Sequence, residues 1–338
     1  MSVKTAVIGL GIMGRRMVEH MAAHPGYSPV AIWDPDAEAC RLAQALAPQA
    51  QIAETAETAI AAADLVYLAC PPAPRKSYAM AAADAGKSVF LEKPLGVDVQ
   101  ESRELVAHLE ARGRPAAVNF TQAAGTALTT VHDAARSGTM GDILGADIIV
   151  TYPAWPRAWQ KAADWLRYRD EGGMTREVIS HFLFFSQRIL GPLSVTWACP
   201  SYPGDDRLCE THMLARLETA DGRPVTVMAS VGGAQPDRQE LTIKGSRASH
   251  RISEFYIDAV SDGGPFTELG ERPADPRAVS LKAQLDDLLL CLDGRPNRLA
   301  TPQEALQVQI LVEQMLAAKG NSSQNQGDAD VDFSQLDD

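Results

Sequence analysis

The sequence predicts a two-domain fold: an α/β half on a parallel, doubly wound sheet, followed by a half built on a mostly antiparallel open sheet. The chain has 338 residues, 46% of them apolar, which is enough material for two hydrophobic cores. Short apolar runs alternate with amphipathic helical stretches up to about residue 118, and closely spaced strand-like runs follow. We therefore place the domains at residues 1–120 and 121–320, with an acidic, disordered tail at 321–338.

Strands and helices alternate through the first half. Runs of apolar and β-branched residues predict five strands and a less well-marked sixth near Gln51, and amphipathic stretches between them predict four helices. Glycine or proline stops several of these helices. The strands are expected at residues 3–8, 30–33, 65–69, 88–91 and 116–118, and the helices at 13–24, 37–46, 77–85 and 100–111.

The second half has a different texture. A helix at residues 127–136 precedes a series of alternating strands, and Ala220-Asp221-Gly222 between two of them predicts a tight hairpin, because Asp-Gly tolerates the positive φ angles of such a turn. Two helices, at 281–292 and 302–318, close the fold. The strands are expected at residues 146–151, 195–199, 212–218, 224–230 and 240–244.

Composition excludes several classes of function. A formal net charge of −12 argues against a nucleic-acid partner, and five aspartates in the tail leave the remainder with only −7. Five widely spaced cysteines without a C-x-x-C pair predict free thiols in a reducing compartment and no metal site. We expect no secretory signal and no membrane span, because the first residues lack a basic flank and a cleavage site and no apolar run nears the ~20 residues that span a bilayer. We expect a cytoplasmic protein.

A G-x-G-x-x-G motif follows the first strand directly and opens the first helix. Gly9 permits a tight turn, Gly11 allows a pyrophosphate to approach the backbone, and Gly14 allows close packing of helix on strand. Ile12 and Met13 lie at the helix N-terminus, which attracts phosphate charge. The motif predicts a Rossmann domain that binds a dinucleotide; the alternative is a glycine-rich turn that binds nothing.

Asp34 ends the second strand, 20 residues after Gly14. A carboxylate there can accept hydrogen bonds from both hydroxyls of the adenosine ribose, and it repels a 2′-phosphate. No arginine follows at once, so NAD is favoured over NADP. The alternative, that Asp34 only caps the helix beginning near Ala37, is weakened by Asp36, which is better placed for capping.

The stretch Gly86-Lys87-Ser88-Val89-Phe90-Leu91-Glu92-Lys93-Pro94-Leu95 carries the most specific signal. Together with the glycine motif, Cys70-Pro71-Pro72 and the stretch from Gly138 to Ile143, it resembles the glucose-fructose oxidoreductase / inositol dehydrogenase / MocA (Gfo/Idh/MocA) family over about residues 3–318. The resemblance implies an NAD-dependent oxidoreductase that forms a homodimer or homotetramer. It places the following residues beside the cofactor, with Arg75 where the family often has histidine: Cys70, Pro71, Pro72, Arg75, Glu92 and Lys93.

Lys93 lies just beyond the carboxyl end of a parallel strand, the edge where open α/β sheets bind ligands. Its ammonium group can hydrogen-bond the reacting oxygen and stabilise the charge that develops there, the role that the resemblance implies. A solvated loop lysine is the alternative.

The family's G-G-x-x-x-D-x-G-x-H motif stands here as Gly172 to His181, with Glu177 at the aspartate position and Ile179 in place of a glycine. Four residues separate Glu177 from His181, so on a helix both side chains face one cleft. His181 is the candidate acid/base and Glu177 its partner or a substrate ligand. The alternative for His181 is a core histidine satisfied by a backbone carbonyl.

Three departures from the family pattern leave the substrate open. Arg176 either binds a substrate carboxylate or forms an ion pair with Glu171 or Glu177. Asn119 opens a segment that replaces the family's glycine- and arginine-rich run, and Phe184 stands where the family has a second aspartate. Aromatic residues including Trp155 and Trp159 precede the motif and either cover the substrate or pack the domain.

Our leading hypothesis is NAD-dependent hydride transfer at a secondary alcohol or ketone of a small polar molecule, a sugar, cyclitol or related carbonyl compound. An imine reductase or an NAD-assisted glycosidase on the same fold is the second reading, and an NAD-binding regulatory protein is the third. Lys93 and His181 are both present, which favours an enzyme.

Overall fold

The computed structural model describes residues 2–160 and 163–318. Its N-terminal sheet is parallel throughout, with the order β3-β2-β1-β4-β5-β6, which confirms the doubly wound half. The strands are β1 (Val3–Ile8), β2 (Tyr27–Trp33), β3 (Gln51–Ile52), β4 (Leu65–Leu68), β5 (Ser88–Glu92) and β6 (Ala116–Asn119). Every residue of β4 and β5 is buried, as expected for central strands covered by helices on both faces.

Five helices connect these strands, and two of them differ from the prediction. They are α1 (Ile12–Ala23), α2 (Ala37–Leu46), α3 (Ala56–Ala62), α4 (Pro72–Asp84) and α5 (Val99–Arg112). The sequence prediction omitted α3, whose buried face consists mainly of alanines and gives little amphipathic contrast. It also started α4 five residues late, because Pro72 is the first residue of the helix, a position that proline tolerates well.

The second sheet has eight strands in the order β14-β13-β12-β11-β7-β10-β9-β8, and only the pairing of β7 with β10 is parallel. The strands are β7 (Ile143–Tyr152), β8 (Leu193–Ser201), β9 (His212–Thr219), β10 (Pro224–Val231), β11 (Arg238–Gly245), β12 (Ser249–Ser253), β13 (Ile257–Ser261) and β14 (Thr267–Glu268). The mostly antiparallel sheet and the hairpin at Gly222, where φ is 84°, are confirmed. The prediction missed β12 to β14, in part because a buried His250–Asp258 pair interrupts the apolar alternation.

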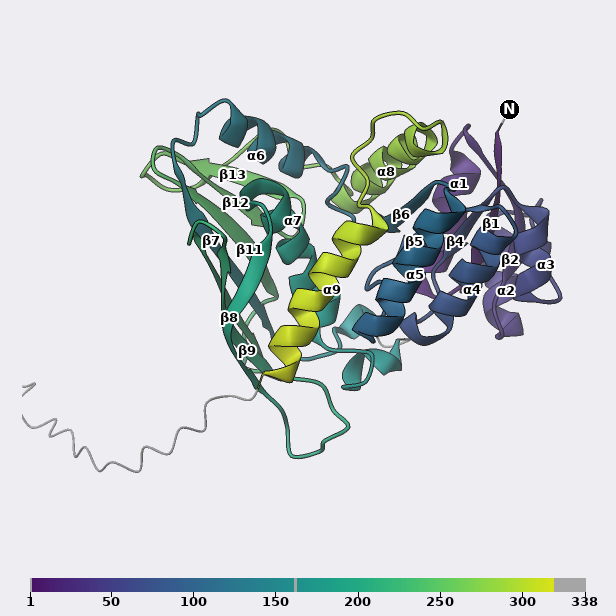
Figure 1. Cartoon of the computed structure of the whole chain (residues 1–338), viewed down its shortest axis with the longest axis horizontal. Helices are drawn as coiled ribbons and strands as arrows, with labels where there is room; N and C mark the ends of the chain where they lie inside the picture. Colours follow the sequence, from purple (N-terminus) through teal and green to yellow (C-terminus); the bar gives the residue numbers. More distant parts are fainter. Residues whose placement is uncertain (1, 161–162, 319–338) are drawn as a thin grey trace, which may run out of the picture.

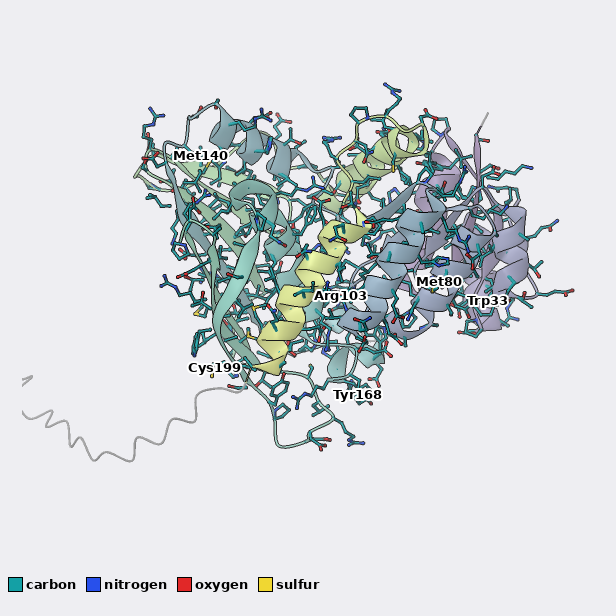
Figure 2. All side chains as sticks on the ribbon, viewed as in Figure 1. Trp33, Met80, Arg103, Met140, Tyr168 and Cys199 are labelled. Carbon is teal, nitrogen blue, oxygen red and sulfur yellow. The ribbon has the colours of Figure 1, made fainter. Side chains whose placement is uncertain are left out.

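Four helices and two 3-10 turns complete the second half, with a π-helical turn before α7. The helices are α6 (Thr126–Arg136), α7 (Ser180–Leu190), α8 (Pro276–Leu292) and α9 (Pro302–Ala317), and the turns are η1 (Ala158–Gln160), η2 (Asp164–Arg167) and η3 (Thr175–Ile179). In Figure 1, α9 runs between the second sheet and α5, and it contacts both α5 and β8. Side chains fill the space between these layers (Figure 2).

The chain returns to the N-terminal half after the second sheet. Leu281, Leu285 and Leu288 of α8 share a core with Val7 and Met17, so α8 covers part of the parallel sheet. This return brings the first residues of α8 to the cleft that contains the glycine loop. The domain limits at 120 and 320 stay a prediction, and the acidic tail lies outside the described residues. Across residues 2–160 and 163–318, no helix has both the length and the apolar character needed to cross a bilayer.

Candidate active site

A cleft of about 690 Å³ lies along the carboxyl ends of the parallel strands, a volume within the ~300–1,000 Å³ range of ligand pockets. One wall comes from the glycine loop and the ends of β2, β4, β5 and β6. The other wall comes from the loop after β7, the start of the π-helical turn and α7, and the start of α8. The cleft therefore places the dinucleotide motif and the second domain's candidate residues in one continuous space.

In the glycine loop, a side chain would fit at Gly11 but not at Gly9 or Gly14. Gly9 has φ +88°, and a Cβ there would lie 2.3 Å from the Cys70 nitrogen. A Cβ on Gly14 would lie 1.8 Å from the Gly9 oxygen, whereas one on Gly11 meets no atom within 4 Å. No side chain caps the N-terminus of α1 at Gly11. The first-turn amides of Ile12 and Met13 are thus available to an anionic group entering the cleft.

Asp34 joins the end of β2 to the glycine loop. Its Oδ2 accepts a hydrogen bond from the Leu10 amide at 2.6 Å and its Oδ1 accepts one from the Asp36 amide at 2.9 Å. The cap of α2 is Asp36, whose Oδ1 accepts from the Glu38 amide, so the capping alternative for Asp34 is wrong. Asp34 lines the cleft with its carboxylate held in place by two backbone donors.

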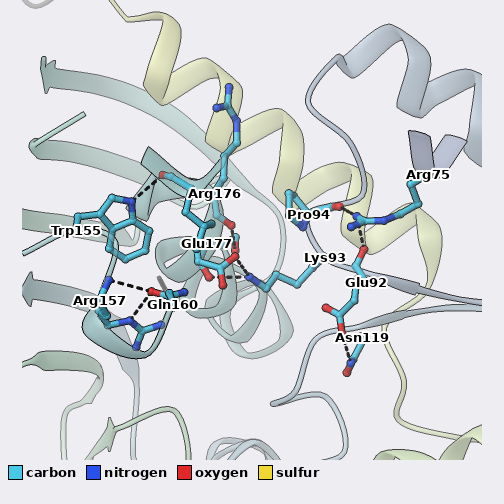
Figure 3. A network of polar contacts seen from close by, with 12 residues as sticks. Arg75, Glu92, Lys93, Pro94, Asn119, Trp155, Arg157, Gln160, Arg176 and Glu177 are labelled. Carbon is cyan, nitrogen blue, oxygen red and sulfur yellow. Dashed lines mark hydrogen bonds and ion pairs between the residues drawn. The ribbon is translucent and has the colours of Figure 1, made fainter. Parts of the chain in front are cut away.

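Arg75 is buried and holds two segments of the backbone together. Its guanidinium donates to the carbonyls of Glu92, at 2.7 Å, and of Pro94 (Figure 3), and to the Cys70 carbonyl at 2.6 Å. These bonds tie the turn after β4 to the segment after β5. Cys70 and Pro71 line the cleft in that turn, whereas Pro72 turns into α4 and does not line it.

The ends of three adjacent strands form a buried polar triad. The register pairs Glu92 with Asn119, and Glu92 Oε1 accepts from Asn119 Nδ2 at 2.7 Å and from the Tyr67 hydroxyl. Burial raises the pKa of the Glu92 carboxyl. Asn119 Oδ1 has no hydrogen-bond partner within the described residues, and Asn119 lines the cleft. Its carbonyl oxygen is therefore available to a bound molecule.

Lys93 reaches from the end of β5 across the cleft. Its Nζ donates to Glu177 Oε2 at 2.5 Å and to the Glu177 carbonyl at 2.8 Å (Figure 3). The two side chains are 8% and 20% exposed, so this ion pair is largely shielded from water. It joins the two halves of the chain at the point where the predicted catalytic residues meet.

His181 lies at the same place, one turn beyond Glu177, and both residues line the cleft. Phe120 and Phe255 contact its ring edge to face, with centroids 5.7 and 5.3 Å away. Burial, followed by the positive charge of Lys93, holds the pKa of His181 well below its usual value, so the imidazole is neutral at neutral pH. Among the described residues no group forms a hydrogen bond with its Nδ1. No backbone carbonyl therefore satisfies this nitrogen, as the core-histidine alternative would require.

Glu210 supports the turn that carries Glu177 and was not foreseen. Its Oε1 accepts from the Thr175 amide at 2.7 Å, and a Cβ on Gly173 would lie 2.4 Å from its Oε2. The π-helical turn from Thr175 to Ile179 therefore rests on a buried carboxylate. In the sequence, only the pair Gly172-Gly173 indicated that another group packs closely against this turn.

Arg176 does not line the cleft. Its guanidinium forms a bidentate pair with Glu313 of α9, at 2.7 and 2.8 Å, and donates to the carbonyls of Arg169 and Gly172. The predicted ion-pair partners, Glu171 and Glu177, are therefore wrong. The correct partner is 137 residues away in sequence and lies on a helix that packs beside the turn.

Replacing Arg176 with methionine should destabilise the protein by about 3 kcal/mol, because Glu313 is left buried without its counter-ion. The side chains are 10% and 19% exposed, so screening by water is slight. Urea unfolding measures the loss. The double change Arg176→Met, Glu313→Leu should recover most of it, and a single-variant loss below about 1 kcal/mol would contradict the assignment.

The aromatic loop splits into two parts. Trp155 donates from its indole nitrogen to the Leu166 carbonyl at 2.9 Å and packs against the core, away from the cleft. Trp159 and Trp165 line the cleft. Two arginines that the sequence analysis did not single out, Arg157 and Arg277, line it as well. No motif marks Arg277, because only the return of the chain through α8 brings it here.

The polar groups described here suit a nucleotide and a small organic substrate. Within residues 2–160 and 163–318 no group of three or more histidine, cysteine, aspartate or glutamate side chains could hold a metal ion.

Comparison with known proteins agrees with this geometry. A family model described as "Oxidoreductase family, NAD-binding Rossmann fold" matches residues 3–120, and one for the GFO/IDH/MocA C-terminal domain matches residues 128–251. A dTDP-3,4-didehydro-2,6-dideoxy-alpha-D-glucose 3-reductase of Streptomyces antibioticus is 29% identical over 181 residues, 53% of each chain. An inositol 2-dehydrogenase of Cereibacter sphaeroides is 34% identical over 118 residues, 34% of this chain and 35% of the relative. The matches thus span about half or less of these curated relatives.

Solved structures show the same fold. An oxidoreductase from Agrobacterium radiobacter, in complex with NAD+, L-tartaric acid and magnesium, has a TM-score of 0.81 at 17% identity, covering 94% of this chain and 97% of that one. The WlbA dehydrogenase from Bordetella pertussis, in complex with NADH and UDP-GlcNAcA, has a TM-score of 0.78 at 19% identity with the same coverage. With both domain models matched in order along one chain, the protein belongs to the Gfo/Idh/MocA family of NAD-binding oxidoreductases.

Proposed function

We propose that this protein is an NAD-dependent dehydrogenase or reductase that acts on a secondary alcohol, or the corresponding ketone, of a sugar, cyclitol or related polar compound. The observation that carries the proposal is the convergence of Lys93, Glu177 and His181 in the cleft that also contains the glycine loop. The similarity to an inositol 2-dehydrogenase and to a keto-sugar 3-reductase supports this class of substrate.

Each residue has a distinct part in this chemistry. The bound nicotinamide would accept or return the hydride of the carbinol carbon. Lys93 donates a hydrogen bond to the reacting oxygen and stabilises its negative charge. His181, neutral in the free protein, accepts the hydroxyl proton during oxidation and returns it during reduction. Glu177 holds the ammonium group of Lys93 in place before the substrate arrives.

The function is tested by following the reduced cofactor while the protein is offered sugars, sugar acids, cyclitols and hydroxy acids. Turnover that requires NAD and at least one of these alcohols supports the proposal. Tight binding of NAD with no net turnover on the whole panel would favour a redox-assisted reaction or a regulatory role. If no dinucleotide binds, the proposed function is wrong.

We also propose that NAD is preferred to NADP. Asp34 lines the cleft with two backbone donors fixing its carboxylate, and the nearby Arg15 already donates to the Leu10 carbonyl at 2.7 Å. A 2′-phosphate would meet this carboxylate and be repelled by it.

Replacing Asp34 with alanine should weaken NAD binding about tenfold and narrow the preference over NADP, because two hydrogen bonds to the ribose are lost. Calorimetric titration with each nucleotide measures both quantities. Asp98→Ala is the matched control: it removes the cap of α5, outside the cleft, and lowers Tm without changing the ratio of the two affinities. An unchanged ratio in Asp34→Ala would contradict the assignment.

We also propose that the protein forms a homodimer or homotetramer. We propose that it lies in the cytoplasm, a reducing compartment. The face of the second sheet that points away from the core exposes Trp197, Leu214 and Met228, each more than 40% accessible, and the register places Leu214 beside Met228. Such a row of apolar side chains suits an interface between subunits. All five cysteines are free. Sedimentation velocity measures the mass, and a monomer at micromolar concentration would exclude the oligomer.

A further inference from the structure

We infer that the substrate is a small hydroxy acid or sugar acid, and that Arg157 and Arg277 bind its carboxylate. The inference rests on the proposed function and narrows its substrate class. The carboxylate takes no part in the transfer: hydride passes from the carbinol carbon to the nicotinamide, and the hydroxyl proton passes to His181.

The two arginines surround one aromatic ring at the edge of the cleft. The guanidinium carbon of Arg157 lies 4.8 Å from the centroid of Trp159, and that of Arg277 lies 5.3 Å from it. Arg157 also lies over Tyr152, at 5.0 Å, and its Nε donates to Gln160 Oε1 at 3.0 Å (Figure 3). Stacking fixes the planes of both guanidinium groups and leaves their terminal nitrogens free to donate.

Neither arginine has a carboxylate partner in the described part of the chain. Glu177, the carboxylate that lines the cleft beside His181, is already paired with Lys93. Both arginines act on His181 strongly enough to contribute, after burial and Lys93, to its lowered pKa. This end of the cleft thus has an excess of positive charge in a protein whose net charge is −12. An anionic group on the substrate would relieve that excess.

A third cation, Arg16, lies near Arg277. The pKa of Arg16 is lowered, first by burial and second by the positive charge of Arg277. Asp275 and Glu19 act on the pKa of Arg16 in the opposite direction, and Asp275 Oδ1 also caps α8 by accepting from the Ala278 amide at 2.9 Å. Arg16 Nη1 is buried without a partner among the described residues. Arg16 does not line the cleft, but its positive charge lies close to that of Arg277.

The size of the cleft favours a small acid. About 690 Å³ has to hold both the dinucleotide and the substrate, whereas one drug-sized ligand alone takes a pocket of ~300–1,000 Å³. A planar carboxylate also matches the bidentate geometry of guanidinium groups.

Paired compounds that differ only in one carboxylate provide the test: D-galacturonate with D-galactose, and D-gluconate with D-glucitol. Thermal unfolding of the full chain, with and without NAD, reports binding, and formation of reduced cofactor reports kcat/KM. We expect at least one acid to raise Tm where its neutral counterpart does not. Arg157→Gln and Arg277→Gln should each weaken that acid's binding by about 10- to 100-fold, and should weaken the binding of NAD by a smaller factor.

Two further variants make the result specific. Arg157→Lys and Arg277→Lys keep the positive charge but lose the planar guanidinium group that can donate two hydrogen bonds to one carboxylate. Their affinity for the acid should therefore lie between those of the glutamine variants and the wild type. Arg272→Gln is the control, because Arg272 pairs with Glu254 outside this cleft and its loss changes the net charge equally.

The possible outcomes separate the inference from the proposed function. If neutral sugars or cyclitols are oxidised with NAD as well as the acids, and the glutamine variants do not change their ratio, the inference is wrong and the function stands. If inorganic phosphate raises Tm and no carboxylate does, the arginines bind phosphate and the inference is again wrong. If an acid binds but NAD does not, the inference stands and the function fails.

Discussion

Lys93→Met is expected to lower kcat/KM by about 10²- to 10³-fold, the effect of removing a fixed donor to an oxygen that gains charge in the transition state. Methionine keeps most of the apolar stem, which is 8% exposed, and removes the ammonium group that lies 2.5 Å from Glu177. The loss should fall mainly on kcat, because the bond to the oxygen strengthens as the charge develops.

Two controls show whether the lost activity reflects chemistry or folding. The Kd for NAD should stay within about threefold of the wild-type value. Glu177→Gln should cost less than Lys93→Met, because the lysine keeps its bond to the Glu177 carbonyl at 2.8 Å. An activity of Lys93→Met within tenfold of wild type would exclude Lys93 as the group that polarises the substrate.

His181→Asn is expected to lower kcat by about 10²- to 10⁴-fold, the usual contribution of a positioned general base. Because burial and Lys93 hold the pKa of His181 well below 6.5, the imidazole is already the free base at pH 7. Alcohol oxidation by the wild type should therefore decline only as the pH falls through that lowered pKa. The variant should lack this acidic limb of its pH profile.

The same lowered pKa makes a prediction about stability. Folded His181 binds fewer protons than unfolded histidine below about pH 6.5, so its contribution to stability is complete above that pH and is lost as the pH falls below it. The drop in unfolding free energy from pH 7.5 to pH 5 should be smaller in His181→Asn than in wild type. His132→Asn, a change at an exposed histidine, is the control and should behave as wild type. Equal drops in all three would contradict a buried neutral imidazole.

Most elements of the fold were predictable because their signals are local. The strand limits 3–8 and the helix limits 37–46 agree with the structure, and most other predicted elements differ from it by a few residues. Where prediction failed, the local signal was masked: alanines replaced larger apolar residues in α3, and a buried His250–Asp258 pair interrupted β12 and β13. In both cases packing stabilises an element whose own pattern is faint.

By itself, the sequence determined the parallel half, the glycine loop, and the positions of Asp34 and Lys93 at strand ends, since each depends on a few contiguous residues. Only the tertiary structure decided which partners the side chains find. Arg176 pairs with Glu313 through the packing of α9, and Arg75 closes on three carbonyls. Arg277 enters the cleft because α8 returns to the parallel sheet. Such contacts join residues more than a hundred positions apart or depend on burial, and neither spacing nor periodicity along the chain encodes them.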